Sequence, residues 1–472
     1  MSVVSVLGGG ISGLSAAHYL VRKNVARVNL YEASDRFGGW IKTQNNEKEG
    51  FLFESGPRTI RPKGDQGNLT LQMIEDLGLE KKVMPIKSDH VAAKNRMIYV
   101  GKKLCLLPSD VGGIFKTLPP FTKPLVFAGL KDLFTGKSKK KLDDESIYDF
   151  TKRRFGSEIA DYAISAMICG ICAGNAKEIS VKFLMKDIFA TEQKYGGVLR
   201  GLLIDNFKSK KIQNKIKYSN LFNRSKLEKW SIYTLEGGLE ILPQQLVKKL
   251  TENNKVSLDL NSKCQEVNFE SNGNIKIRIN DQLHDSTHLI SSIPSEQLSQ
   301  LVSKQHPKLA NELQEIKNVN VAVINLHYRS DKLLKYQGFG LLVPPIENLP
   351  ILGIIFDSSC LDMKDQTVLT VMMGGAWFEK RFGDNPTEQH LLDVALKSIK
   401  DILNIEQTPD NYKVNILNKC IPQYILGHHQ RVERIRDYIK DHKLPLNLCG
   451  ASYDGVGVND VILSAQTAVN KI

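Results

Sequence analysis

The sequence predicts an α/β protein of more than one domain, and we expect its two ends to build one of these domains together. The length of 472 residues exceeds what one ordinary core holds, so two or three domains are expected. Residues 2–7 form a short β-branched run typical of a buried strand, and a glycine-rich loop and a helical segment follow it. Near the other end, a short strand at 446–449 leads through a second glycine-rich turn into a helix at 461–469. The predicted fold is a discontinuous, Rossmann-like α/β domain with further domains between its parts.

The composition is that of a globular protein, with 42% apolar and 24% charged residues. The formal charge of +13 favours an anionic partner, which could be nucleic acid, an acidic membrane surface or a negatively charged substrate. Lysines spread over the surface for solubility explain the same charge equally well. Because aromatic residues are not interleaved with the basic ones, we expect no nucleic-acid partner.

The seven cysteines are an odd number and lie far apart, which argues for reduced thiols rather than disulfides. Cys169 and Cys172 form a CxxC pair, but no second pair or histidine cluster accompanies them, so we predict no metal site. The pair lies in an apolar stretch, where small buried residues are the simpler explanation. No apolar run of about eighteen residues predicts a membrane-spanning helix. Because a buried strand begins at Val3, we expect no cleavable presequence.

The first glycine loop has the spacing of a dinucleotide site. Gly8 suits the tight turn, Gly10 lets the backbone approach a pyrophosphate, and Gly13 permits close packing of the helix on the strand. The N-terminus of the helix offers free N–H groups to phosphates. A second strand at 28–31 ends in Glu32, which can accept hydrogen bonds from both ribose hydroxyls. Strand, loop, helix, strand and acid together predict dinucleotide binding.

The residues that follow point to FAD. Residues 36–40 (RFGGW) resemble the Arg-x-Gly-Gly element of the amine-oxidase-like flavoproteins, with Arg36 expected near the pyrophosphate. Residues 450–460 (GASYDGVGVND) resemble the closing block of the same superfamily, whose last helix points its N-terminus at the pyrimidine end of the flavin. That helix end would stabilise negative charge on reduced flavin. The glycines at 455 and 457 fit a close approach of the backbone to the ring.

Blocks in the middle of the chain resemble one family within this superfamily, the protoporphyrinogen oxidases of animals and fungi. They are FESGPRTIRP at 53–62, AGN at 173–175 with EIS at 178–180, GGLE at 237–240, QGFG at 337–340 and CIPQY at 420–424. The matching blocks run from residue 3 to residue 469. In two places the chain departs from the family: His429 stands where many relatives carry a Trp, and residues 208–223 are a Lys- and Asn-rich stretch without a counterpart.

The resemblance implies the oxidation of protoporphyrinogen IX to protoporphyrin IX in three two-electron rounds, with hydride transfer to flavin N5 and reoxidation by dioxygen. No protein side chain is then expected to act as catalytic acid or base, since the cofactor carries the reaction. Arg96 matches the propionate-binding arginine, and Phe339, Gly340, Leu342 and Met372 match the positions that line the macrocycle. The expected FAD contacts are made by Gly8, Gly9, Gly10, Ile11, Ser12, Gly13, Glu32, Ala33, Arg36, Gly39, Trp40, Gly56, Pro57, Arg58, Thr59, Cys264, His429, Val456, Gly457 and Val458.

The resemblance also implies a domain plan and a location. The FAD-binding domain would comprise residues 1–65, 231–295 and 415–472, and a mixed-sheet substrate domain residues 66–90 and 296–414. Residues 91–230 would form a helical insertion that attaches peripherally to the mitochondrial inner membrane, on the intermembrane-space side. A homodimer is expected, with ferrochelatase as a candidate partner. The alternatives are a related flavin amine oxidase and a non-catalytic carrier that keeps the dinucleotide fold.

Overall fold

The computed structural model describes residues 2–25, 27–136, 143–208, 218–361 and 363–472, and it divides the chain into two units. Unit 1 is made of Met1–Lys87, Tyr218–Lys317 and Gln430–Ile472, and unit 2 of Ser88–Lys217 and Asn318–His429. The predicted insertion at 91–230 falls largely in unit 2, together with the strands of the mixed sheet. The division into three domains stays a prediction.

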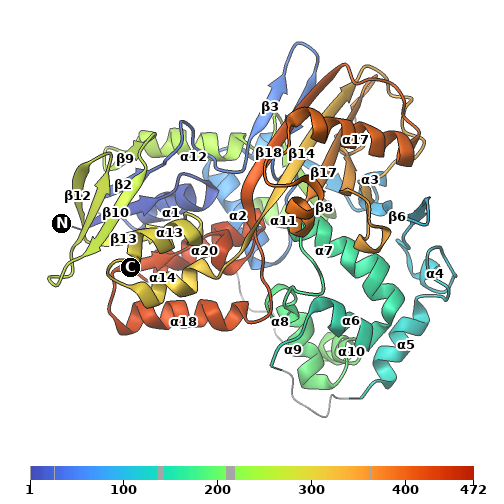
Figure 1. Cartoon of the computed structure of the whole chain (residues 1–472), viewed down its shortest axis with the longest axis horizontal. Helices are drawn as coiled ribbons and strands as arrows, with labels where there is room; N and C mark the ends of the chain where they lie inside the picture. Colours follow the sequence, from blue (N-terminus) through green and yellow to red (C-terminus); the bar gives the residue numbers. More distant parts are fainter. Residues whose placement is uncertain (1, 26, 137–142, 209–217, 362) are drawn as a thin grey trace. The chain divides into compact units, whose positions relative to one another are not determined.

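Unit 1 is built on a five-stranded sheet whose strands are all parallel, in the order β19-β13-β1-β2-β9 (Figure 1). Its central strand β1 comes from the start of the chain and its edge strand β19 from the end, so the prediction of one domain built from both ends is confirmed. The strands are β1 (Val3–Leu7), β2 (Arg27–Tyr31), β9 (Val256–Asp259), β13 (His288–Ser291) and β19 (Leu446–Leu448).

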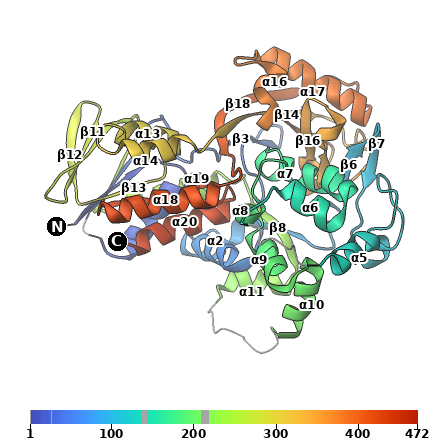
Figure 2. The same ribbon diagram turned by 60° about the horizontal axis from the view of Figure 1, so that its bottom comes forward.

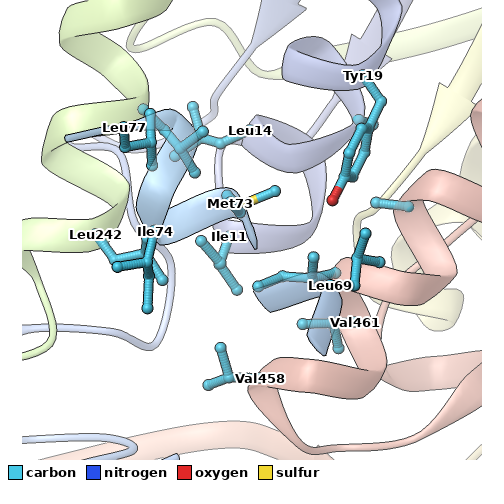
Figure 3. Close-up of a cluster of buried hydrophobic side chains, with 14 of the residues drawn as sticks. Ile11, Leu14, Tyr19, Leu69, Met73, Ile74, Leu77, Leu242, Val458 and Val461 are labelled. Carbon is cyan, nitrogen blue, oxygen red and sulfur yellow. The ribbon is translucent and has the colours of Figure 1, made fainter. Parts of the chain in front are cut away.

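Side chains of the sheet alternate between two cores. Val4 and Val6 of β1 belong to a cluster with helices from both ends of the chain and from the middle, and Figure 3 shows ten of its labelled residues. Leu7 points to the opposite face, where a second cluster joins the sheet to the three-stranded sheet β10-β11-β12 and to α13, α14 and α18. The first cluster involves α1 (Ile11–Arg22), α2 (Gly64–Asp76), α12 (Ile241–Thr251) and α20 (Val458–Asn470).

Smaller elements complete unit 1. A hairpin of β3 and β4 and a two-stranded sheet of β5 and β8 carry the residues between the two halves of the domain. The elements of this group and of the second face are β3 (Thr43–Asn46), β4 (Phe51–Glu54), β5 (Val83–Lys87), β8 (Trp230–Leu235), β10 (Cys264–Phe269), β11 (Ile275–Ile279), β12 (Gln282–Ser286), α11 (Asn220–Leu227), α13 (Ser295–Val302), α14 (Pro307–Gln314), α18 (His428–Asp441) and α19 (Ala451–Asp454).

Unit 2 contains a seven-stranded mixed sheet in the order β18-β14-β17-β16-β15-β6-β7, in which β15 and β6 are the parallel pair. One face packs its apolar residues against α16 and α17, and the other face meets α7 (Figure 2). The elements are β6 (Arg96–Val100), β7 (Lys103–Leu106), β14 (Asn318–Tyr328), β15 (Gly340–Leu342), β16 (Ile351–Phe356), β17 (Thr367–Gly374), β18 (Asn411–Pro422), α7 (Ser165–Cys172), α16 (Phe378–Phe382) and α17 (Glu388–Leu403).

A group of helices in unit 2 is held by a buried ion-pair network. Arg154 is fully buried and pairs with Glu192, and its Nη1 lies 3.6 Å from Oδ1 of Asp132, which is fully buried as well. Such a network is stable only when the charges satisfy one another away from water. It ties together α5 (Val126–Phe134), α6 (Ile147–Phe155) and α9 (Lys186–Tyr195). Within the described ranges, no helix is long and apolar enough to cross a membrane.

Candidate functional site

The glycine loop leaves the carboxyl end of β1, the central strand, where β2 and β13 diverge to either side. Ligands of open α/β sheets bind at such a switch point. A Cβ on Gly13 would come within 1.9 Å of the Gly8 carbonyl oxygen, so the packing role predicted for Gly13 has a direct steric cause. A Cβ on Gly10 would meet one atom within 4 Å, the Gly39 Cα at 3.7 Å. The protein itself therefore leaves room beside Gly10, as close approach of a ligand requires.

The helix α1 begins at Ile11, inside the loop and earlier than the sequence pattern indicates. Its N-cap Gly10 has no side chain, so no side chain caps the first turn. The first N–H groups of the helix are therefore available to a phosphate, and the helix dipole favours negative charge there.

Glu32 follows β2 and lies beside the loop. Its Oε2 accepts a hydrogen bond from the Gly9 N–H at 2.6 Å, and its Oε1 accepts from the Ser34 N–H at 2.8 Å. A Cβ on Gly9 would lie 2.9 Å from the Glu32 Cβ and 2.6 Å from the ring of Phe37, so Gly9 is required by packing. Ala33, directly after Glu32, is exposed. The carboxylate is thus held at the edge of the loop, where a ribose hydroxyl would meet it.

Arg36 shapes the turn that follows. Its guanidinium donates to the carbonyl oxygens of Gly39 (2.7 Å) and Ile41 (2.6 Å) and pairs with Glu240 Oε1 at 2.8 Å. The Glu240 Oε2 in turn accepts from the Thr43 N–H at 2.8 Å. Arg36 therefore fixes the Gly38–Gly39 turn, and Glu240 offsets much of its charge. A role beside the pyrophosphate stays a prediction.

The 56–59 block is anchored on the same turn. A Cβ on Gly56 would lie 2.0 Å from the Trp40 carbonyl oxygen, so Gly56 is needed for this chain crossing. Trp40 itself is 45% exposed, and Pro57, Arg58 and Thr59 are half-buried. The following Ile60 exchanges two backbone hydrogen bonds of 2.8 Å with Tyr233, which ties the block to β8.

The C-terminal loop meets the glycine loop across more than 440 residues of sequence. Ser12 Oγ lies 3.5 Å from the Val461 carbonyl oxygen, and a Cβ on Gly450 would lie 3.4 Å from the same Oγ. Figure 3 shows Ile11 near Val458 and Val461, in the region where α1 and α20 begin. The helix α20 begins at Val458, three residues earlier than predicted, because the Gly457 N–H donates to the Asp460 carboxylate at 3.2 Å.

The last predicted cofactor residues lie on different elements. Val456 and Gly457 are half-buried in the loop before α20. Cys264 starts β10 two residues after Ser262, whose N–H donates to the Glu32 carbonyl oxygen at 2.7 Å. Burial raises the pKa of the Cys264 thiol to about 12, so it stays protonated. His429 is half-buried in the first turn of α18.

The candidate substrate residues come together on one face of the unit 2 sheet. Arg96 pairs with Gly340, and Leu342 pairs with Gly353, which pairs with Met372 on the next strand. Because opposed residues of neighbouring strands share a face, Arg96, Leu342 and Met372 lie on the same side. Gly353, between Leu342 and Met372, leaves this row without a central side chain.

This is the face that meets α7. A Cβ on Gly170 of α7 would come within 2.9 Å of a Leu342 methyl carbon, and Met372 packs on a cluster that contains Cys169 and Ala173. Gly340 has φ +143°, and a Cβ there would lie 2.2 Å from the Ile354 carbonyl oxygen. Phe339, just before the strand, is half-buried, and Arg96 is exposed at the start of β6. The face thus offers apolar side chains with one cation at its edge.

The CxxC pair belongs to the core, as the sequence indicates. Burial raises the pKa of Cys169 and of Cys172 to about 12, and their thiols lie near carbonyl oxygens of their own segment. Thiols with such pKa values are unreactive near neutral pH. In the part of the chain that the structure describes, no group of three or more His, Cys, Asp or Glu side chains could hold a metal ion.

Comparisons with known proteins decide the family. Residues 11–472 match the family model described as flavin containing amine oxidoreductase. The chain is 39% identical to the protoporphyrinogen oxidase of Bos taurus over 99% of this chain and 98% of that protein. It is 31% identical to the protoporphyrinogen oxidase of Schizosaccharomyces pombe over the same shares. The chain belongs to the protoporphyrinogen oxidase family of flavin-containing amine oxidoreductases.

Solved structures agree on the fold. A putative protoporphyrinogen oxidase from Exiguobacterium has a TM-score of 0.80 at 22% identity and covers 100% of this chain and 98% of its own. Cyclohexylamine oxidase from Brevibacterium oxydans has a TM-score of 0.69 at 14% identity, with the same coverage. The predicted α/β fold with a discontinuous Rossmann-like domain is therefore confirmed as the flavin amine oxidase type. The chain is an oxidoreductase, and its cofactor is FAD.

The glycine loop fits this cofactor, and the structure adds residues that the sequence pattern did not single out. Glu240 holds Arg36, and the buried Glu54 accepts from the Leu239 N–H (2.7 Å) and the Thr43 hydroxyl (2.8 Å). Asn459, in the first turn of α20, donates to the Arg61 carbonyl oxygen at 2.8 Å and so joins the last helix to the 53–62 block. Glu240 and Asn459 lie inside the family blocks, so the blocks contained a signal for them, but only contacts reveal what they hold.

Proposed function

We propose that this chain oxidises protoporphyrinogen IX to protoporphyrin IX, the penultimate step of haem synthesis. Six hydrogens leave the substrate in three rounds, and each round reduces one dioxygen to hydrogen peroxide. The observation that carries the proposal is similarity to protoporphyrinogen oxidases along essentially the whole chain, at up to 39% identity. The amine oxidases share the fold at 14–15% identity, which supports no shared substrate.

Bound FAD supplies the two-electron acceptor and returns the electrons to dioxygen. The protein residues that would hold it are those around the glycine loop. The open space beside Gly10 and the uncapped N-terminus of α1 suit the pyrophosphate. The carboxylate of Glu32 suits the ribose hydroxyls. The N-terminus of α20 adds a second positive helix end close to that of α1, which favours negative charge on the reduced ring.

The substrate is a flat apolar macrocycle with two propionates, and unit 2 has a face of matching chemistry. Leu342 and Met372 would contact the macrocycle across the row left open by Gly353. Phe339 and Gly340 would line its edge. Arg96 would grip a propionate bidentately. The protein then orients the ring and excludes water, while the loss of hydrogen is driven by aromatisation.

A substrate panel tests the proposal. Purified protein loaded with FAD should convert protoporphyrinogen IX to fluorescent porphyrin and release three molecules of hydrogen peroxide per porphyrin. Coproporphyrinogen III is the necessary comparison, because relatives at 23–24% identity in Bacillus subtilis and Staphylococcus aureus are coproporphyrinogen III oxidases. Turnover of cyclohexylamine or putrescine without porphyrinogen turnover would refute the proposal and favour the amine oxidase alternative. Protein that takes up no FAD would favour the carrier alternative.

We also propose that helices within 91–230 attach to a membrane surface. Large apolar side chains are exposed there, including Val111 (72%), Phe115 (62%) and Phe134 (85%). Lys116 and Lys131 lie close to them in sequence, and short apolar segments edged by lysines suit interfacial attachment. Flotation with vesicles containing an anionic lipid should carry the protein upward. The double variant Phe115→Ser/Phe134→Ser should float less, while Leu283→Ser, which removes an exposed leucine of β12, should float as the wild type does.

Location and assembly follow the family. We propose a mitochondrial enzyme on the intermembrane-space side of the inner membrane, a homodimer, with ferrochelatase as a candidate partner. The support is similarity to animal and fungal protoporphyrinogen oxidases. Protease protection in isolated mitochondria and in mitoplasts tests the location: the protein should be degraded once the outer membrane is opened. Sedimentation of the purified protein tests the dimer.

A further inference from the structure

A groove lies between α14 and α18 in unit 1, away from all the residues assigned to cofactor or substrate. Its volume is about 730 Å³, and its lining comes from these two helices alone. Charged side chains from both helices share the lining with the apolar Leu309 and Ile435. Figure 1 shows α14 and α18 next to each other at the lower left. A volume of this size is that of a site for a small organic molecule.

Two arginines on α18 share one carboxylate in this groove. Glu312 of α14 accepts from Arg434 Nε at 2.7 Å and from Arg434 Nη2 at 2.8 Å, so a single guanidinium occupies both carboxylate oxygens. This pairing lowers the pKa of Glu312, which is therefore ionised at neutral pH. Arg431 Nε lies 3.8 Å from Glu312 Oε2, beyond hydrogen-bond distance. The three groups carry a net charge of +1.

Arg431 is the unsatisfied member of the cluster. Its side chain is 15% exposed, whereas that of Arg434 is 53% exposed. Among the described residues, Arg431 Nε and Nη1 have no hydrogen-bond partner. A largely buried guanidinium normally has acceptors for its donors, because leaving them without partners is costly. The other two charged residues of the lining, Lys308 and Glu315, have opposite signs, so the excess positive charge rests with Arg431.

We propose that this groove binds an organic anion whose carboxylate or phosphate oxygens pair with Arg431 and whose apolar body packs on Leu309 and Ile435. A carboxylate or phosphate matches the planar fork of a guanidinium and would supply the acceptors that Glu312 does not. The apolar residues of the lining favour an organic anion over an inorganic one. This site is separate from the proposed oxidase chemistry and does not depend on it.

Isothermal titration of the FAD-loaded protein tests the site. The probes are benzoate and phenyl phosphate, with benzyl alcohol as the uncharged comparison and inorganic phosphate as the anion without an apolar body. We expect benzoate or phenyl phosphate to bind, benzyl alcohol to bind at least tenfold more weakly, and inorganic phosphate to bind more weakly than phenyl phosphate. Comparing benzoate with phenyl phosphate distinguishes a carboxylate ligand from a phosphate ligand. Absence of binding by both at millimolar concentration would overturn the proposal.

Variants locate the binding. Arg431→Gln should weaken the bound probe at least tenfold, and Arg431→Lys, which keeps the charge but loses the fork, should weaken it less. Lys440→Gln removes one exposed positive charge from the same helix outside the groove and should bind as the wild type does. Equal losses in Arg431→Gln and Lys440→Gln would mean general charge attraction and would refute the site. The melting temperature and the FAD content of each variant show whether it is folded, and Arg431→Lys decides the question if Arg431→Gln is not.

Discussion

Replacing Gly10 by alanine separates a glycine required by the ligand from one required by the protein. Gly10 has φ −71° and ψ 175°, which any residue adopts, and its new Cβ would meet one atom within 4 Å, at an ordinary contact distance of 3.7 Å. The protein without FAD should therefore be as stable as the wild type, or more stable by about 0.4–1 kcal/mol, because alanine restricts the unfolded chain. The methyl group fills space at which a pyrophosphate would approach the backbone. FAD affinity should fall at least tenfold, or about 1.4 kcal/mol.

Gly13→Ala is the matched comparison. Its Cβ would lie 1.9 Å from the Gly8 carbonyl oxygen and 2.7 Å from Ser292 Oγ, so the loop and helix must move apart. We expect a lower melting temperature of the protein without FAD, as well as loss of FAD. The assays are thermal melting of the FAD-free protein and fluorescence titration with FAD. If Gly10→Ala binds FAD with wild-type affinity, the backbone at Gly10 does not approach the cofactor and the account of the loop is wrong.

Three further predictions concern other parts of the chain. Arg96→Ala should raise KM for protoporphyrinogen about tenfold or more and leave the FAD content unchanged; loss of flavin from this variant would mean that Arg96 is misassigned. Glu240→Ala should lower the melting temperature and the retention of FAD, because it removes acceptors from Arg36 and the Thr43 N–H. His18 is buried, and burial lowers its pKa from 6.5 to about 4, so the unfolded state binds the proton first as pH falls. The free energy of unfolding should therefore decrease between pH 6.5 and pH 4, by up to about 3 kcal/mol from this group, and His18→Gln should show a shallower decrease in denaturant titrations.

The cofactor domain could be predicted closely from the sequence because its pattern is local. A β-branched strand, a loop with fixed glycine spacing and an acid after the next strand each follow from backbone geometry within about thirty residues. The structure places Gly8, Gly13 and Glu32 as that geometry requires. The helix starts at Ile11 and Val458 were predicted late, since a helix that begins in a glycine loop has no side-chain cap to mark its first residue.

The substrate face could not be derived from local pattern. Arg96, Gly340 and Met372 lie on three strands that are far apart in the chain, and their shared face depends on strand order and register. Their periodicity is that of any strand, so only the family resemblance singled them out. The same holds for Glu240, whose contacts with Arg36 and Thr43 cross about two hundred residues of sequence. Long-range pairing of this kind becomes visible only in the folded chain.

The central claim is that FAD bound by this chain takes electrons from protoporphyrinogen and passes them to dioxygen. An anaerobic half-reaction tests it most directly. The absorbance of the protein-bound flavin should bleach when protoporphyrinogen IX is added without oxygen. Admission of air should restore it, while porphyrin fluorescence and hydrogen peroxide appear. Flavin that stays oxidised in the presence of protoporphyrinogen IX would contradict the account.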